Sequence, residues 1–213
     1  MSVPGVETEL YEMAGKDFHP CIADYKCYRD GECVYKDDLQ DFAKRYIEAD
    51  GIILGSPVYH MSVPATMKAA LDRLGNIIMC NYLRQNKTAP RFNKVCGAVT
   101  VGAARHGGEE MTLNFLINSC LLNNGVVIAG DTAIGNYIGA AATHYGLIPG
   151  EVDRYERLMR KDVILEDKKG IELAINLGIR VAEMTRIVRA GISALEKELP
   201  GEYFYSWEDF HWD

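Results

Sequence analysis

The sequence predicts an α/β protein with a mostly parallel sheet. Short apolar runs bounded by glycine or proline alternate with amphipathic helical patterns, and this alternation is typical of right-handed β-α-β crossovers. The 213-residue length fits one domain with a short extension, which we place at residues 1–200 and 201–213. Hydrophobic residues make up 48% and charged residues 25%, as in ordinary soluble globular proteins.

The first elements are a short strand and a helix. Residues 8–13 (TELYEM) alternate polar and apolar side chains, which predicts a strand. Residues 37–49 predict a helix, because acidic residues stand at its start and its apolar residues fall on one face: Leu39, Phe42, Tyr46 and Ile47. We interpret the neighbouring carboxylates Asp37 and Asp38 as helix-capping groups.

Two strand-to-helix units follow. Residues 51–56 (GIILGS) predict a strand buried on both faces, and a helix begins near Pro64 with apolar residues at helical spacing: Met67, Leu71, Leu74 and Ile78. Residues 94–101 predict the next strand, and residues 102–108 a glycine-rich turn. The helix over 109–123 offers four candidates for inward-facing side chains: Met111, Phe115, Leu121 and Leu122.

A further buried strand is predicted at residues 125–129 (GVVIA). Residues 168–199 form one long helical pattern, which we expect to break or bend near Gly178 or Gly191. Ligands of such sheets bind beyond the carboxyl ends of the strands. The loops that follow Ser56 and Val101 are therefore the expected binding region.

Charge and cysteine usage exclude several classes of function. Acidic residues outnumber basic ones by 30 to 23, giving a net charge of −7, which argues against a nucleic-acid or anionic-membrane surface. No apolar run approaches the ~18 residues of a membrane span. Because the first residues show no secretory pattern, we expect a cytoplasmic protein whose six cysteines stay reduced.

The loop at residues 55–64 leaves a buried strand and enters a helix. Its glycine, aromatic ring, imidazole and hydroxyl side chains stand near a helix N-terminus, an arrangement that suits a planar redox ring. The alternative is a plain helix-start turn in which Tyr59 only packs.

Three segments carry a resemblance to a known family. They are residues 50–59 (DGIILGSPVY) with Met67-Lys68 and Asp72-Arg73, residues 101–112 (VGAARHGGEEMT), and residues 21–38 (CIADYKCYRDGECVYKDD). Over roughly residues 5–185 the chain resembles the flavodoxin-like NADPH-dependent FMN reductases, and within them the iron–sulfur flavoproteins. The resemblance implies a doubly wound parallel sheet with helices on both faces.

The resemblance also implies the residues that contact FMN. One wall of the flavin site would be Ser56, Pro57, Val58, Tyr59, His60, Met61, Ser62 and Val63, and the other Gly102, Ala103, Ala104, Arg105, Gly107 and Gly108. The glycines allow backbone amides to reach the ring, and Arg105 either holds negative charge or is a solvated surface arginine.

Three functions are compatible with this pattern. In the first, FMN takes a hydride from NAD(P)H and passes electrons to a small-molecule, quinone or iron–sulfur acceptor, with no obligatory catalytic side chain. In the second, the protein is an iron–sulfur and flavin electron carrier. In the third, a flavodoxin-like protein has lost its cofactor.

The chain departs from the family pattern at its N-terminus. The family begins with a strand and a loop that binds the FMN phosphate, whereas residues 3–10 already match the end of the first helix and the start of the second strand. That first strand normally lies in the middle of a 2-1-3-4-5 sheet. We expect a shortened version of a longer chain, or a different strand order or neighbouring subunit that fills the gap.

The cysteine segment, which we place as an inserted loop at residues 19–36, also departs from the pattern. The family's 4Fe–4S motif is C-x2-C-x2-C with a fourth cysteine further on, and here Asp24 replaces the second cysteine among Cys21, Cys27 and Cys33. Three interpretations stay open: a 4Fe–4S cluster with Asp24 as a ligand, a three-iron cluster on the cysteines, or free thiols without a cluster. We expect the other three cysteines to be filler in the core or at the surface: Cys80, Cys96 and Cys120.

Two segments in the C-terminal part of the chain are candidates for substrate or subunit contacts. Residues 131–150 are placed near the flavin face by the resemblance, which makes His144 and Tyr145 candidates for substrate contact. The tail at 202–213 is unusually aromatic, so we expect it to pack across a homo-oligomer interface, in a dimer or tetramer.

Overall fold

The computed structural model describes residues 3–85, 87–91, 93–104, 106–144, 156 and 159–210. Arg105 and Tyr145 lie outside the described residues. The helices are α1 (Lys26–Asp30), α2 (Leu39–Glu48), α3 (Ala65–Arg84), α4 (Glu109–Leu122) and α6 (Lys168–Ala194). The strands are β1 (Gly51–Pro57), β2 (Val95–Gly102), β3 (Val126–Val127) and β4 (Ala140–Thr143).

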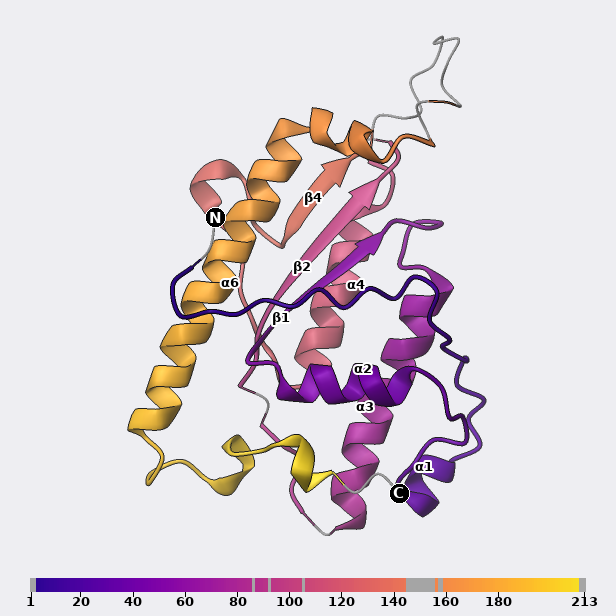
Figure 1. The fold of residues 1–213 in the computed structure, drawn as a ribbon, viewed down its shortest axis with the longest axis vertical. Helices are drawn as coiled ribbons and strands as arrows, with labels where there is room; N and C mark the ends of the chain where they lie inside the picture. Colours follow the sequence, from indigo (N-terminus) through magenta and orange to yellow (C-terminus); the bar gives the residue numbers. More distant parts are fainter. Residues whose placement is uncertain are drawn as a thin grey trace.

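All strand pairs of the sheet are parallel, as predicted. β1 pairs with β2 from Gly51 opposite Val95 to Pro57 opposite Val101. On its other side β2 pairs first with the two-residue β3 and then with β4. β2 is therefore the central strand, and β1, β2 and β4 run side by side to a common carboxyl end (Figure 1).

Helices cover both faces of this sheet. α6 packs against β1, β2 and β4, and Leu177 and Val181 fill the space beside Gly97. The residues on either side of Gly97 are Cys96 and Ala98, and they point to the other face of the sheet. There they belong to a core formed with α2, α3 and α4. The alternation along β2 thus separates α6 on one face from α2, α3 and α4 on the other, which confirms the doubly wound α/β class (Figure 1).

β1 differs from the prediction of a strand buried on both faces. Leu54 is buried, but the side chain of its neighbour Ile53 is 41% exposed. Among the described residues β1 is also an edge strand, since it pairs only with β2. Residues 8–13 do not form the predicted strand. The ring of Tyr11 in this segment packs on Phe42 of α2.

Two helix predictions need correction. In α4 the side chains of Met111, Leu121 and Leu122 are exposed and Phe115 is half-buried, whereas the buried positions are Glu109, Thr112, Leu113, Leu116 and Cys120. α6 continues through Gly178 and Gly191 without a break. A helical glycine costs only about 1 kcal/mol, and the packing of α6 on the sheet outweighs that cost.

The aromatic tail packs on its own chain. The rings of Tyr205 and Phe210 lie 4.8 Å and 6.0 Å from that of Tyr82 in α3, and Trp207 stacks on Phe210. Phe210 is buried in the same core as α3. Tyr205, Trp207 and Phe210 therefore have ring contacts within the chain, and packing of the tail across a homo-oligomer interface stays a prediction. No helix in the described part of the chain is long and apolar enough to cross a membrane.

Candidate functional site

A hollow opens at the carboxyl ends of β1, β2 and β4, and we call it the loop pocket. It lies where ligands bind in doubly wound sheets. Its walls come from the loop after β1, the loop after β2 with the start of α4, and the end of β4: Met61, His106, Gly108, Glu109, Glu110, Met111, Ala141 and Thr143.

The loop after β1 is a tight reversal fastened to the sheet. The amide of Val58 donates to the carbonyl of Val101 over 2.9 Å, and Tyr59 and Ser62 exchange two backbone hydrogen bonds of 2.7 and 3.1 Å. His60 and Met61 between them have φ values of 47° and 69°, the left-handed conformation of a primed turn. Non-glycine residues in this conformation are uncommon and concentrate at ligand sites.

The loop after β2 lies directly against this reversal. Gly108 has φ +113°, and a Cβ atom built on it would stand 2.7 Å from the Cα of Met61. Only a glycine permits both the backbone angle and the close approach. The two loops are thus in contact at one end of the sheet, as the sequence predicted, although Arg105 itself lies outside the described residues.

Of the fourteen predicted flavin residues, two line the loop pocket in the part of the chain that the structure describes. Met61 and Gly108 line the loop pocket, and Tyr59, with 62% of its surface exposed, stands on the same loop as Met61. Ser56 and Val63 are buried; the Ser56 hydroxyl donates to the carbonyl of Pro57 over 2.8 Å. These two side chains support the loop and do not line its pocket.

Sequence reasoning placed residues 131–150 near the flavin face, but it predicted neither the strand β4 nor a pocket-lining place for Glu109 and Glu110. Glu109 and Glu110 belong to the first turn of α4, and Thr143 ends β4. Glu109 is 8% exposed, and a Cβ on Gly102 would lie 2.3 Å from its Oε1. The helix-start position of the two glutamates was visible in the sequence, whereas the alanine-rich β4 (AAAT) gives no strand signal. His144 donates its backbone amide to Gly102 and so fastens β4 to this end of the sheet.

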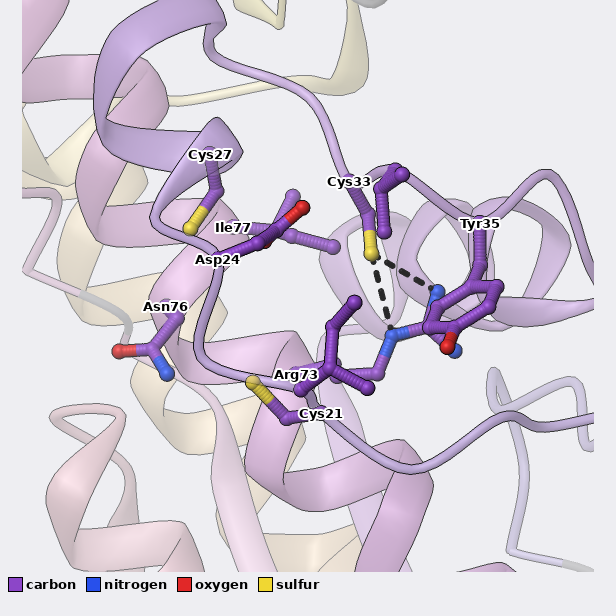
Figure 2. Close-up of a pocket in the computed structure, with 10 residues that line it drawn as sticks. Cys21, Asp24, Cys27, Cys33, Tyr35, Arg73, Asn76 and Ile77 are labelled. Carbon is purple, nitrogen blue, oxygen red and sulfur yellow. Dashed lines mark hydrogen bonds between the residues drawn. The ribbon is translucent and has the colours of Figure 1, made fainter.

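A second, smaller pocket lies between the cysteine segment and α3, and we call it the cysteine pocket (Figure 2). All four residues that the resemblance assigned to a metal line it: Cys21, Asp24, Cys27 and Cys33. Cys21 is exposed, and Cys27 and Cys33 are half-buried. Asp24 also accepts a hydrogen bond from the amide of Lys26 at the start of α1.

The donor set of the cysteine pocket consists of three thiols and one carboxylate. Among the residues that the structure describes, no three histidine, cysteine or acidic side chains are grouped closely enough to hold one metal ion. An iron–sulfur cluster spreads its ligands more widely, because each protein ligand binds a different iron. Three thiols and one carboxylate around one hollow are compatible with that arrangement.

A buried ion pair supports the floor of the cysteine pocket. The guanidinium of Arg73 in α3 is 2% exposed and the carboxylate of Asp37 is 1% exposed. Arg73 Nη1 and Nη2 donate to the two oxygens of Asp37 over 2.5 and 3.0 Å, a bidentate pair. Arg73 Nε and Nη2 donate to Cys33 Sγ over 3.3 and 3.1 Å (Figure 2).

Asp37 is therefore more than a helix cap, contrary to the sequence interpretation. Burial alone would raise the pKa of Asp37, but hydrogen bonds from Arg73 and from the amides of His19 and Leu39 outweigh it and lower the pKa to about 2. Asp38 makes no side-chain cap to α2 and accepts a 2.7 Å hydrogen bond from the amide of Asp17.

The remaining cysteines are buried, as predicted. Cys96 and Cys120 lie in the core beneath β2 and α4. Cys80 of α3 stands behind the cysteine pocket, where burial and the neighbouring Cys27 raise its pKa to about 12. Cys80 thus stays protonated near neutral pH and is a core residue.

Comparison with known proteins identifies the family of this chain. Residues 1–138 match the family described as NADPH-dependent FMN reductase. The chain belongs to this family. An iron–sulfur flavoprotein of Methanocaldococcus jannaschii is 36% identical over 185 residues, which cover 87% of this chain and 84% of that protein. An iron–sulfur flavoprotein of Archaeoglobus fulgidus is 30% identical over 175 residues, covering 78% of this chain and 86% of the relative.

These relatives place this chain in the iron–sulfur flavoprotein branch of the family, which confirms the resemblance seen in the sequence. Family membership also places it among flavin-dependent oxidoreductases. The structure of RosB with bound 8-demethyl-8-formylriboflavin-5'-phosphate matches 92% of this chain and 75% of its own, with a TM-score of 0.53 and 18% identity. That similarity supports the flavodoxin-like α/β fold.

Proposed function

We propose that this FMN reductase family member binds FMN in the loop pocket and oxidises NAD(P)H, passing electrons to a small-molecule, quinone or iron–sulfur acceptor. The observation that carries this proposal is the contact between the two loops, at Gly108 and Met61, beside the loop pocket. Two converging backbone segments at the carboxyl edge of a parallel sheet suit a flat ring that needs amide donors.

The residues of the two loops have distinct roles in this proposal. The reversal at residues 58–62 supplies one wall, with the ring of Tyr59 and the thioether of Met61 as apolar surfaces. The segment at 102–108 supplies backbone amides as donors, and Gly108 allows this segment to lie against the backbone of Met61. Bound FMN would supply the hydride chemistry, and the protein would position the ring and limit its contact with water.

We further propose that the cysteine pocket holds an iron–sulfur cluster on Cys21, Cys27 and Cys33, with Asp24 as the fourth ligand of a 4Fe–4S form. Its support is that all four side chains line one hollow. A carboxylate is a harder ligand than a thiolate, so we expect the iron bound to Asp24 to be the most labile, with a three-iron form as its product.

Absorption spectroscopy of the anaerobically purified protein, with FMN, iron and sulfide quantified, tests both proposals. Flavin bands that bleach when NADPH or NADH is added support the reductase. A brown protein with iron and sulfide whose colour bleaches only with a stronger reductant supports an electron carrier. A protein that stays colourless after FMN titration and iron–sulfur reconstitution contradicts both and leaves a fold that has lost its cofactors.

A further inference from the structure

The hydrogen-bonding capacity of Arg73 is fully used, and two of its donors converge on one sulfur. A guanidinium has five N–H groups. Two are directed at the Asp37 carboxylate, one at the carbonyl of His19 over 3.0 Å, and two at Cys33 Sγ. Within the described residues, Cys33 is the only cysteine whose sulfur receives such a pair of donors.

This arrangement is what a negatively charged sulfur requires. A neutral thiol is a weak acceptor, so two charge-assisted donors on one thiol would be poorly used. Asp37 balances the charge of Arg73 on one edge of the guanidinium, and the other edge faces Cys33 in the pocket. The ring of Tyr35 lies 5.3 Å from the guanidinium carbon and fixes its plane from the side.

We infer that Arg73 is a positioning residue for the cluster of the cysteine pocket: it holds Cys33 in place and raises the reduction potential by donating two hydrogen bonds to the ligand sulfur. The inference rests on the proposed cluster. Reduction adds one electron, and hydrogen bonds to sulfur stabilise the extra negative charge. Asp37 acts in the opposite sense, because its negative charge offsets the guanidinium.

The test is a one-electron potentiometric titration of the reconstituted protein with dithionite, monitored by electron paramagnetic resonance. Arg73→Lys keeps the charge beside Asp37, but an ammonium cannot reproduce the planar fork that serves the carboxylate and the sulfur together. We expect the reduction equilibrium to become about tenfold less favourable, which for a one-electron couple is about 59 mV more negative. The iron retained after desalting should also fall.

Asp37→Asn is the matched control, because it removes the counter-charge and leaves the donors to Cys33 in place. We expect its potential to move in the positive direction. A merely structural role for the ion pair predicts that both variants shift alike, so equal shifts would overturn the inference. An Arg73→Lys protein with wild-type potential and iron content would overturn it too.

The same experiment separates this inference from the proposal on which it rests. If the wild-type protein takes up no iron and sulfide on reconstitution, the proposed cluster is wrong and the inference falls with it. If the wild type holds a cluster and the two variants do not move in opposite directions, the cluster stands and only the role of Arg73 is overturned. Far-ultraviolet circular dichroism of each variant confirms that the compared proteins are folded.

Discussion

The loop pocket and the cysteine pocket are shaped by different parts of the chain. In the loop pocket the backbone sets the shape, through left-handed turn residues, a close-approach glycine and hydrogen bonds between main-chain groups. In the cysteine pocket side chains set the shape, through an ion pair between Arg73 and Asp37. These two residues are 36 positions apart in the sequence. Removing an exposed side chain from the loop pocket should therefore alter ligand binding with little loss of stability, whereas breaking the ion pair of the cysteine pocket should destabilise the fold.

The largest effect is expected from removing one member of the buried ion pair. Asp37→Ala leaves the Arg73 charge buried and uncompensated, and we expect a loss of about 3–5 kcal/mol in the free energy of unfolding. Urea denaturation measures it. The neighbouring variant Asp38→Ala is the control: its carboxylate is 37% exposed, so it should cost about 1 kcal/mol or less. Equal losses in the two variants would contradict the difference between the pockets.

The second largest effect is expected at low pH, where the contribution of Asp37 to the free energy of unfolding should be lost. Asp37 has a folded pKa of about 2 against an ordinary value of 3.8, so the unfolded state binds the proton more readily. Its contribution is complete above pH 4 and is lost as the pH falls from about 4 to 2, amounting to about 2 kcal/mol. The free energy of unfolding against pH should show this fall in the wild type and a shallower one in Asp37→Asn. Parallel curves for the two proteins would rule out the assignment to Asp37.

In the loop pocket, Gly108→Ala should weaken FMN binding by about tenfold, or about 1.4 kcal/mol. The added methyl group would collide with Met61 and push the loops apart. Quenching of flavin fluorescence on titration gives the dissociation constant. Gly15→Ala is matched to it in backbone strain, since Gly15 has φ +77°, but no atom lies within 4 Å of the new methyl. Unchanged FMN affinity in Gly108→Ala would argue against a site between these loops.

The smallest effect on stability is expected for Tyr59→Ala. Because Tyr59 is 62% exposed, its loss should change the free energy of unfolding by only about 0.5 kcal/mol. Loss of an aromatic contact with the ring, worth about 0.5–1.5 kcal/mol, should weaken FMN binding about twofold to tenfold. If Tyr59→Ala lowers the free energy of unfolding by more than it weakens the free energy of FMN binding, the expected difference between the two pockets is wrong.

These differences also explain which parts of the structure the sequence predicted. β1, α3 and β2 follow from local apolar patterns, and the placement of the loops after β1 and β2 follows from the rule for parallel sheets. β4 escaped prediction because its alanines resemble a loop. Leu121 and Leu122 were misassigned because apolar type alone does not decide which face of α4 meets the sheet.

The ion pair beneath the cysteine pocket was missed for a different reason. Arg73 and Asp37 come together only in three dimensions, so no local pattern joins them. A signal did exist: Arg73 stands between Ala70 and Ile77 on the buried side of α3, where a charged residue requires a partner. The choice among acidic partners needed the tertiary structure, and the nearby helix start made capping the simpler explanation for Asp37.

The central claim is that the loops after β1 and β2 hold one flat ring between them, and amide hydrogen exchange with and without FMN tests it most directly. Peptides covering residues 57–63 and 102–108 should both exchange more slowly in the complex, while the end of α6 is unaffected. If FMN binds and slows exchange in only one of these peptides, or in neither, the two loops do not enclose the ring and the proposed site is wrong.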